Sequence, residues 1–194
     1  MPILGIMASQ ISGHLWAPEG AYDSLATVTV PSGGVASITF AGIPSTYKHL
    51  QIRAMAQTNR ATYGIDEMKA TFNSDTGSNY VVHFLYGDGG SASASYDAAT
   101  TFMKLGSGFF GTTTGSNWGS MLVDILDYTN TSKYTTARTL GGADCNGTVG
   151  GLGGRVGLTS GLWMNTAAVT SISLVPAVGT NFSQYSSFAL YGVR

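Results

Sequence analysis

The side chains with the greatest chemical potential are few and widely separated. The three histidines, His14, His49 and His83, lack the i+2, i+3 or i+4 partners of metal sites, so we predict structural histidines and no metal centre. The single cysteine, Cys145, would need a base brought to it by folding before it could act as a nucleophile. We interpret it as a half-buried structural thiol.

Two pairs of acidic residues are candidates for general acid and base catalysis. They are Asp66 with Glu67 and Asp124 with Asp127. A glycosidase needs two carboxyl groups about 5 to 10 Å apart, a distance that sequence spacing does not fix. Because solvated turn and strand roles are ordinary for such residues, no pair stands out. We therefore predict no catalytic residues and no enzymatic activity.

The glycine-rich run over residues 150–157 invites comparison with a phosphate-binding loop. It lacks the terminal Gly-Lys-Ser/Thr of such a loop and the third glycine of a dinucleotide fingerprint, and no helix follows it. We predict a flexible β-loop and no cofactor.

Composition narrows the class of partner. Of the 194 residues only 10% are charged, with nine basic and ten acidic side chains, while 27 are glycine. A surface this close to neutral does not gather phosphate backbones, so nucleic acid is excluded as the expected partner. A lone cysteine likewise excludes a disulfide-stapled module. No stretch approaches the roughly 18 apolar residues of a spanning helix, so we expect no membrane insertion.

Period-two alternation in short runs dominates the chain and predicts an all-β fold, an antiparallel, jelly-roll-like β-sandwich of roughly eight to ten strands. We expect a hairpin around residues 31–34 and a second one between residues 68–72 and 80–86. Residues 96–105 could form one or two helical turns. The predicted strands cover residues 25–30, 36–40, 49–56, 68–72, 80–86, 121–126, 134–140, 169–175 and 188–193.

Three segments rich in glycine, serine and threonine, residues 87–95, 106–119 and 141–157, are predicted to be long loops. Aromatic rings in or beside them could stack on sugars or anchor a protein contact, although core packing is the alternative for about half of them. These candidate contacts are Tyr96, Phe109, Phe110, Trp118 and Trp163.

The chain divides into an extended N-terminal anchor segment, residues 1–22, and a sandwich domain, residues 23–194. Apolar side chains of the segment follow neither strand nor helix periodicity, so we expect them to bind a partner surface, the alternative being an edge strand of the same sandwich. The start of the segment lacks the basic residues of a signal peptide. The anchor residues are Ile3, Leu4, Ile6, Met7, Ile11, Leu15 and Trp16.

Four stretches resemble a group of small virion proteins of tailed bacteriophages. They are residues 1–13 (MPILGIMASQISG), 43–53 (IPSTYKHLQIR), 72–80 (FNSDTGSNY) and 188–194 (FALYGVR). The resemblance spans most of the chain and carries no catalytic residues. It implies a small non-enzymatic virion protein of a group commonly labelled as tail or fibre components, and it does not itself separate a tail from a head location. Because no signal peptide is predicted, we expect the chain to be made in the host cytoplasm and to be part of the virion.

Several functions stay open at this stage. The alternatives to a tail or fibre protein are a head decoration or cement protein, a carbohydrate-binding module and a glycan hydrolase. The expected partners are further copies of the chain, with a trimer as the leading expectation, other virion proteins, and a host-surface glycan as a further candidate.

The anchor hypothesis predicts the effect of a truncation. A chain that begins at Ala21 should keep nearly the full melting temperature but fail to join its oligomer or particle, because the lost residues contact a partner and not the domain core. Thermal melting and a particle-incorporation assay check this. Unfolding or aggregation of the truncated chain at low concentration would show that the segment belongs to the core.

Overall fold

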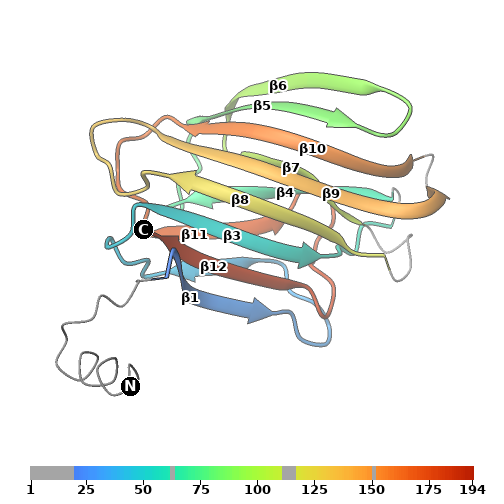
Figure 1. The fold of residues 1–194 in the computed structure, drawn as a ribbon, viewed down its shortest axis with the longest axis horizontal. Helices are drawn as coiled ribbons and strands as arrows, with labels where there is room; N and C mark the ends of the chain where they lie inside the picture. Colours follow the sequence, from blue (N-terminus) through green and yellow to red (C-terminus); the bar gives the residue numbers. More distant parts are fainter. Residues whose placement is uncertain (1–19, 62–63, 111–116, 150–151) are drawn as a thin grey trace, which may run out of the picture.

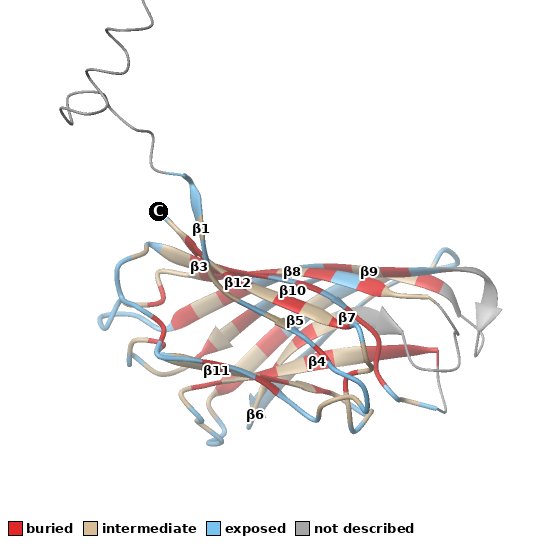
Figure 2. Ribbon diagram, turned by 90° about the horizontal axis from the view of Figure 1, so that it is seen from below, coloured by how far each residue is buried: buried red, intermediate tan, exposed pale blue. Residues whose placement is uncertain are grey.

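The computed structural model describes residues 20–61, 64–110, 117–149 and 152–194, which form two antiparallel sheets packed face to face (Figure 1). Figure 2 shows the two layers from the side, with buried residues in the strands of both. The predicted all-β sandwich is confirmed. Within these described ranges there is no helix, and hence none of the length and hydropathy needed to cross a membrane.

The larger sheet has eight strands in the order β1-β12-β3-β8-β9-β10-β5-β6, and the smaller has four in the order β2-β11-β4-β7. The strands of the larger sheet are β1 (Tyr22–Thr29), β3 (His49–Ala56), β5 (Tyr80–Gly87), β6 (Ala92–Thr100), β8 (Gly119–Leu126), β9 (Thr135–Val149), β10 (Leu152–Trp163) and β12 (Ser187–Val193). Those of the smaller sheet are β2 (Ile38–Ala41), β4 (Ile65–Phe72), β7 (Met103–Phe110) and β11 (Ser171–Pro176).

Both predicted hairpins are wrong, because each joins strands of different sheets. The turn at residues 31–34 forms, with the Gly34 amide donating to the Pro31 carbonyl (3.2 Å), but β1 and β2 on its two sides belong to opposite layers. The same holds for β4 and β5. Turn chemistry indicates that the chain reverses, but it does not say in which sheet the next strand pairs.

The prediction of loops at the glycine-rich segments is also largely wrong, as is the helical alternative at residues 96–105. Strands β6, β7, β9 and β10 run through these stretches. Gly161 on β10 shows why glycine suits a strand here: a Cβ at this position would lie 2.5 Å from the sulfur of Met103 on β7. The missing side chain lets the two sheets approach closely.

Trp163, Tyr80 and Phe72 form the aromatic centre of the core, with ring centroids 5.6 to 6.5 Å apart. All three are fully buried. The indole Nε1 of Trp163 donates a hydrogen bond to the Asp75 carboxylate (2.7 Å), so the polar group of this ring is satisfied at the core boundary.

Asp66, at the start of β4, is fully buried and fixes the segment that follows β11. Its carboxylate accepts hydrogen bonds from the Thr58 hydroxyl (2.8 Å) and from the amides of Glu67 (2.8 Å), Val178 (3.2 Å) and Gly179 (2.9 Å). A buried carboxylate is tolerated when it receives several donors in this way. Asp66 therefore serves as a structural acceptor.

Replacing Asp66 with alanine should lower the free energy of unfolding by about 3 kcal/mol or more, because several buried donors lose their acceptor. Asp66→Asn, which keeps one acceptor oxygen, should cost less. Urea unfolding of both variants checks this. Equal losses for the two variants would contradict the acceptor role.

Candidate functional site

The outward-facing residues of the larger sheet include a row of leucines on four adjacent strands. Leu122 on β8 pairs with Leu140 on β9, Leu140 with Leu158 on β10, and Leu158 with Leu85 on β5. We call these four residues the leucine row. Leu85, Leu140 and Leu158 are each at least 50% exposed. The row runs across the strands, so the register alone brings its members together.

Leucine is unexpected on the solvent face of a sheet, where alternation normally places polar residues. The inward neighbours are already buried: Ala137 and Thr139 on β9 and Thr159 on β10 face the other sheet. The leucine row is therefore additional apolar surface that the described residues of one chain do not cover. Contiguous exposed apolar surface is common at interaction sites, so the leucine row is a candidate for one.

Val156 extends the leucine row along β10 and stands between two hollows. Its partners in the register are Gly142 on β9 and Gly87 on β5, which have no side chains to flank it. The hollow toward Leu85 measures about 280 Å³ and the one toward Arg53 about 430 Å³. Alternating projections and hollows allow complementary side chains of a partner to enter.

A row of polar residues borders the leucine row. Asp124, Arg138, Ser160 and His83 occupy successive strands in register. On β3 the Gln51 amide nitrogen donates to the Asp124 carboxylate (2.8 Å). An apolar centre with a polar border is the usual anatomy of a protein interface.

Arg53, beside this border, is held by three neighbours. Its Nε donates to the Gln51 side-chain oxygen (2.8 Å), and its guanidinium lies over the rings of Tyr22 (5.1 Å) and Tyr191 (4.9 Å). The β1–β12–β3 side of the sheet is therefore preorganised by polar and cation–π contacts.

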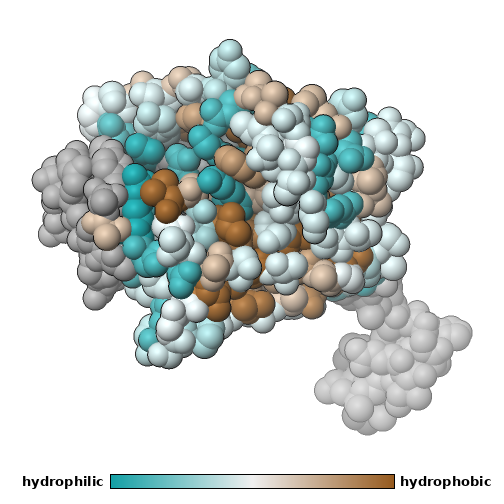
Figure 3. Space-filling view, turned by 180° about the vertical axis from the view of Figure 1, so that it is seen from behind, coloured by the Kyte–Doolittle hydropathy of each residue, from teal (hydrophilic) through white to brown (hydrophobic). Residues whose placement is uncertain are grey.

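The outer face of the smaller sheet differs in character. Figure 3 views the molecule from that side, where hydrophilic and neutral residues cover much of the surface and the hydrophobic residues form separate patches. Outward residues on its strands include Thr39 and Ser173, whose hydroxyls are hydrogen-bonded (3.3 Å), and Lys69, which lies over the Phe102 ring. The leucine row thus distinguishes one face of the sandwich.

The candidate contact residues from the sequence have different outcomes. Tyr96 is 64% exposed on β6 and stacks on His83, with ring centroids 5.6 Å apart. Trp118 is half-buried just before β8. Trp163 is 1% exposed, so its prediction as a loop contact is wrong: its ring fills the core.

The remaining candidates lie outside the part of the molecule that the structure describes. Phe109 and Phe110 belong to β7 by their backbone, but their side chains fall outside the described residues, as does that of Cys145 on β9. The anchor residues also lie outside them: Ile3, Leu4, Ile6, Met7, Ile11, Leu15 and Trp16. The described domain begins its first strand at Tyr22, one residue before the predicted boundary.

The stretches that carry the phage resemblance have structural roles where they are described. Residues 43–53 include the first part of β3, and residues 188–193 belong to β12, which pairs with it. The Tyr47 ring lies against Gly192, where a Cβ would come within 2.4 Å of it, and the Tyr128 hydroxyl donates to the Pro44 carbonyl. These contacts join the segment before β3 to the end of β12 and to the turn after β8.

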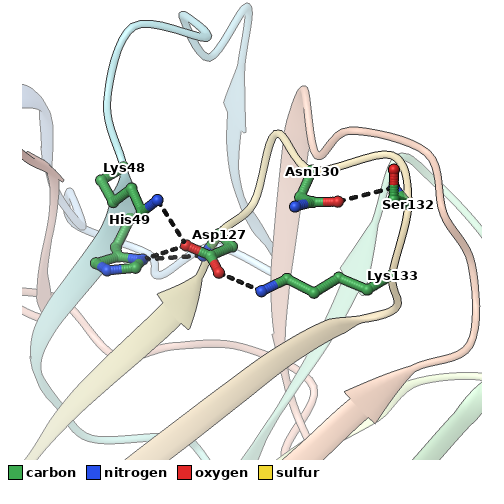
Figure 4. A network of polar contacts seen from close by, with 6 residues as sticks. All are labelled: Lys48, His49, Asp127, Asn130, Ser132 and Lys133. Carbon is green, nitrogen blue, oxygen red and sulfur yellow. Dashed lines mark hydrogen bonds and ion pairs between the residues drawn. The ribbon is translucent and has the colours of Figure 1, made fainter.

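Asp127, at the end of β8, is the centre of a charged cluster (Figure 4). Its carboxylate pairs with Lys133 and lies 3.8 Å from the Lys48 ammonium, and its amide donates to Nδ1 of His49 (2.9 Å). The hydrogen bond from Lys133, and then the charges of Lys133 and Lys48, hold the pKa of Asp127 below its usual value despite partial desolvation.

Three of the four acidic residues considered for catalysis are engaged in structural contacts. Asp66 is buried among backbone donors, Asp124 accepts from Gln51, and Asp127 is paired with lysines. Among the described residues, no three His, Cys, Asp or Glu side chains gather in a manner that could hold a metal ion.

Comparison with known proteins adds little to this geometry. No family model matches the chain, and no curated protein matches it. Among solved structures, the chain aligns with the CBM2 module of the evolved Dit of Lactobacillus casei BL23 phage J-1 at 11% identity, covering 91% of this chain and 81% of that one, with a TM-score of 0.20. A similarity at that TM-score supports no conclusion about function.

The Asp127 cluster predicts a pH-dependent contribution to stability. Because the folded-state pKa is lowered, the contribution is present above the unfolded pKa near 4 and is lost as the pH falls through the folded value. Asp127→Asn should therefore be less stable than the native chain at pH 7, and the difference should shrink on acidification and at high salt. Urea unfolding of both proteins from pH 7 down to below about pH 4 measures the difference in their free energies of unfolding. A difference that does not change with pH would contradict the prediction.

Proposed function

We propose that this protein is a non-enzymatic structural subunit of a tailed-phage virion, in the tail or fibre apparatus, and that it binds a neighbouring virion protein through the leucine row. The observation that carries the binding role is the row itself, four leucines in register on adjacent strands with a polar border. The phage assignment is supported by the resemblance of residues 1–13, 43–53, 72–80 and 188–194.

The low charge of the chain is consistent with a role in assembly. With 10% charged residues, its surface lacks the strong field that would favour many charged partners, so contact area and shape must provide the specificity. Burying one half-exposed leucine contributes about 1 kcal/mol or more, and several acting together provide useful affinity. A head decoration protein, the alternative role, could bind its neighbours through the same face. The position of the chain on the particle separates the tail role from the head role.

A second candidate function, binding of a host-surface glycan, is favoured by Tyr96. This exposed ring stands in register with His83, beside a hollow of about 570 Å³ whose lining includes Arg138 and Ser160. A flat ring next to hydrogen-bonding side chains can stack on a sugar. Glycan-array binding that is lost in Tyr96→Ala and kept in Leu122→Lys, a leucine-row variant outside the lining of this hollow, would support this role over the protein interface.

The interface proposal predicts that Leu140→Lys/Leu158→Lys is excluded from particles. Both side chains are half exposed, so the melting temperature should change little, whereas loss of two apolar contacts should reduce incorporation by at least about tenfold. Quantitative mass spectrometry of purified particles made with each variant measures this.

Thr71→Lys, on the outer face of the smaller sheet, is the matched control and should be incorporated like the native chain. Cryo-EM of the same particles should show the leucine row against another protein. Absence of the chain from particles, or normal incorporation of the double variant, would overturn the proposal.

A further inference from the structure

Strand β6 forms one edge of the larger sheet, at the opposite side from β1 (Figure 1). It pairs with β5 on one side, and on its other side no strand of the described residues pairs with it. An open edge presents a row of backbone donors and acceptors that another strand can use.

The register of the β5–β6 hairpin indicates which residues of β6 direct their backbone N–H and C=O groups away from β5, toward the open edge. The amide of Asp88 donates to the Ser91 carbonyl (3.2 Å), so Asp88 and Ser91 are a hydrogen-bonded pair at the turn. In an antiparallel ladder such pairs alternate with non-hydrogen-bonded pairs. Ser93, Ser95 and Asp97 therefore bond to β5, whereas the backbone groups of Ala92, Ala94 and Tyr96 point away from the sheet.

Strand β6 carries few of the devices that block edge pairing. It contains no proline and no lysine, and most of its side chains are small. Its one charge, Asp97, is paired with Lys104 on β7 (2.7 Å). The only distortion is a register shift at the far end, where Ala99 has a positive φ. Residues 92–97 thus form a regular edge whose single charge is already paired.

The other three edges are less suitable. Strand β1 has a register shift between Ser24 and Ala26 and an ion pair between Asp23 and Arg194 (2.6 Å). Strand β2 has only four residues, and the pairing of β7 with β4 has two register shifts. Edges that are short or bulged are poor templates for pairing.

We propose that β6 pairs antiparallel with β6 of a second copy of the chain, about a two-fold axis at Ala94. This inference is independent of the proposed function. Ala94 then lies opposite Ala94 of the second copy, and Ala92 opposite its Tyr96. The backbone groups of Ala92, Ala94 and Tyr96 from each chain would form about six interchain hydrogen bonds.

Side chains on the outer face fit this two-fold arrangement. The Tyr96 ring meets Ala92 of the second copy, where the small side chain leaves room for it. Ala94 is in register with Leu85, so the leucine row continues through Ala94 into the second copy. Asp97 lies opposite Ser91 of the second copy, which keeps the two Asp97 carboxylates about 20 Å apart. No like charges meet.

A charge swap at the axis tests the pairing. In sedimentation equilibrium the native full-length chain should form a concentration-dependent dimer. Ala94→Lys and Ala94→Asp should each be monomeric, because two like charges would face each other at the axis. An equimolar mixture of the two variants should recover a dimer. Unchanged melting temperatures of the monomeric variants confirm that they fold.

Thr27→Lys, which places the same charge on the outer face of β1, is the matched control and should dimerise like the native chain. The proposal would be overturned by a native chain that is monomeric at all concentrations, by an Ala94→Lys variant that associates normally, or by a mixture that stays monomeric. A native trimer would favour the three-fold expectation from the sequence and would also overturn the two-fold pairing.

Discussion

The antiparallel register of β8, β9, β10 and β5 determines which side chains enter the core and which face solvent. Val123, Ala137 and Val82 point inward, while Leu122, Leu140 and Leu85 lie between inward residues and point outward. A slip of one residue would exchange the two sets. Because both faces carry apolar residues, hydrophobic burial alone specifies this register weakly, and fully buried large side chains such as Trp163 and Tyr80 must select it through their size.

Glycine has two physical roles in this sandwich. Inside, Gly161 and Gly192 make room for Met103 and Tyr47, so the absence of a Cβ sets the close approach of neighbouring layers and loops. Outside, Gly142 and Gly87 flank Val156 and create the hollows of the apolar face. The same composition that reduces strand propensity therefore shapes both the packing and the candidate interface.

Some of this architecture could be predicted from the sequence. The alternation at residues 49–56 and 121–126 correctly indicates β3 and β8, because each strand has one inward apolar face. The pairing of strands could not be obtained, since turn residues do not determine the sheet in which the next strand lies. The glycine-rich strands could not be predicted either, because their stability comes from contacts with other strands and not from local preference.

The leucine row was missed for a related reason. Leu85, Leu140 and Leu158 are far apart in the chain, and each is unremarkable until the register aligns them. The signal that was available is an outward leucine at the centre of a glycine-rich stretch, as in Leu158 between Gly157 and Gly161.

The face and the edge of the larger sheet are geometrically coupled. Strand β6 is a continuation of the surface that carries the leucine row, so pairing at this edge would place two leucine rows in one continuous sheet. A partner that contacts both rows binds the second one at a high effective concentration, and its overall affinity exceeds that for either row alone. A modest apolar row on each subunit would then be sufficient for stable attachment in a repeated assembly, because neither row alone would need a high affinity. Such a division of affinity between subunits would allow a chain with few charged residues to be held in an assembly without a large apolar patch on each copy.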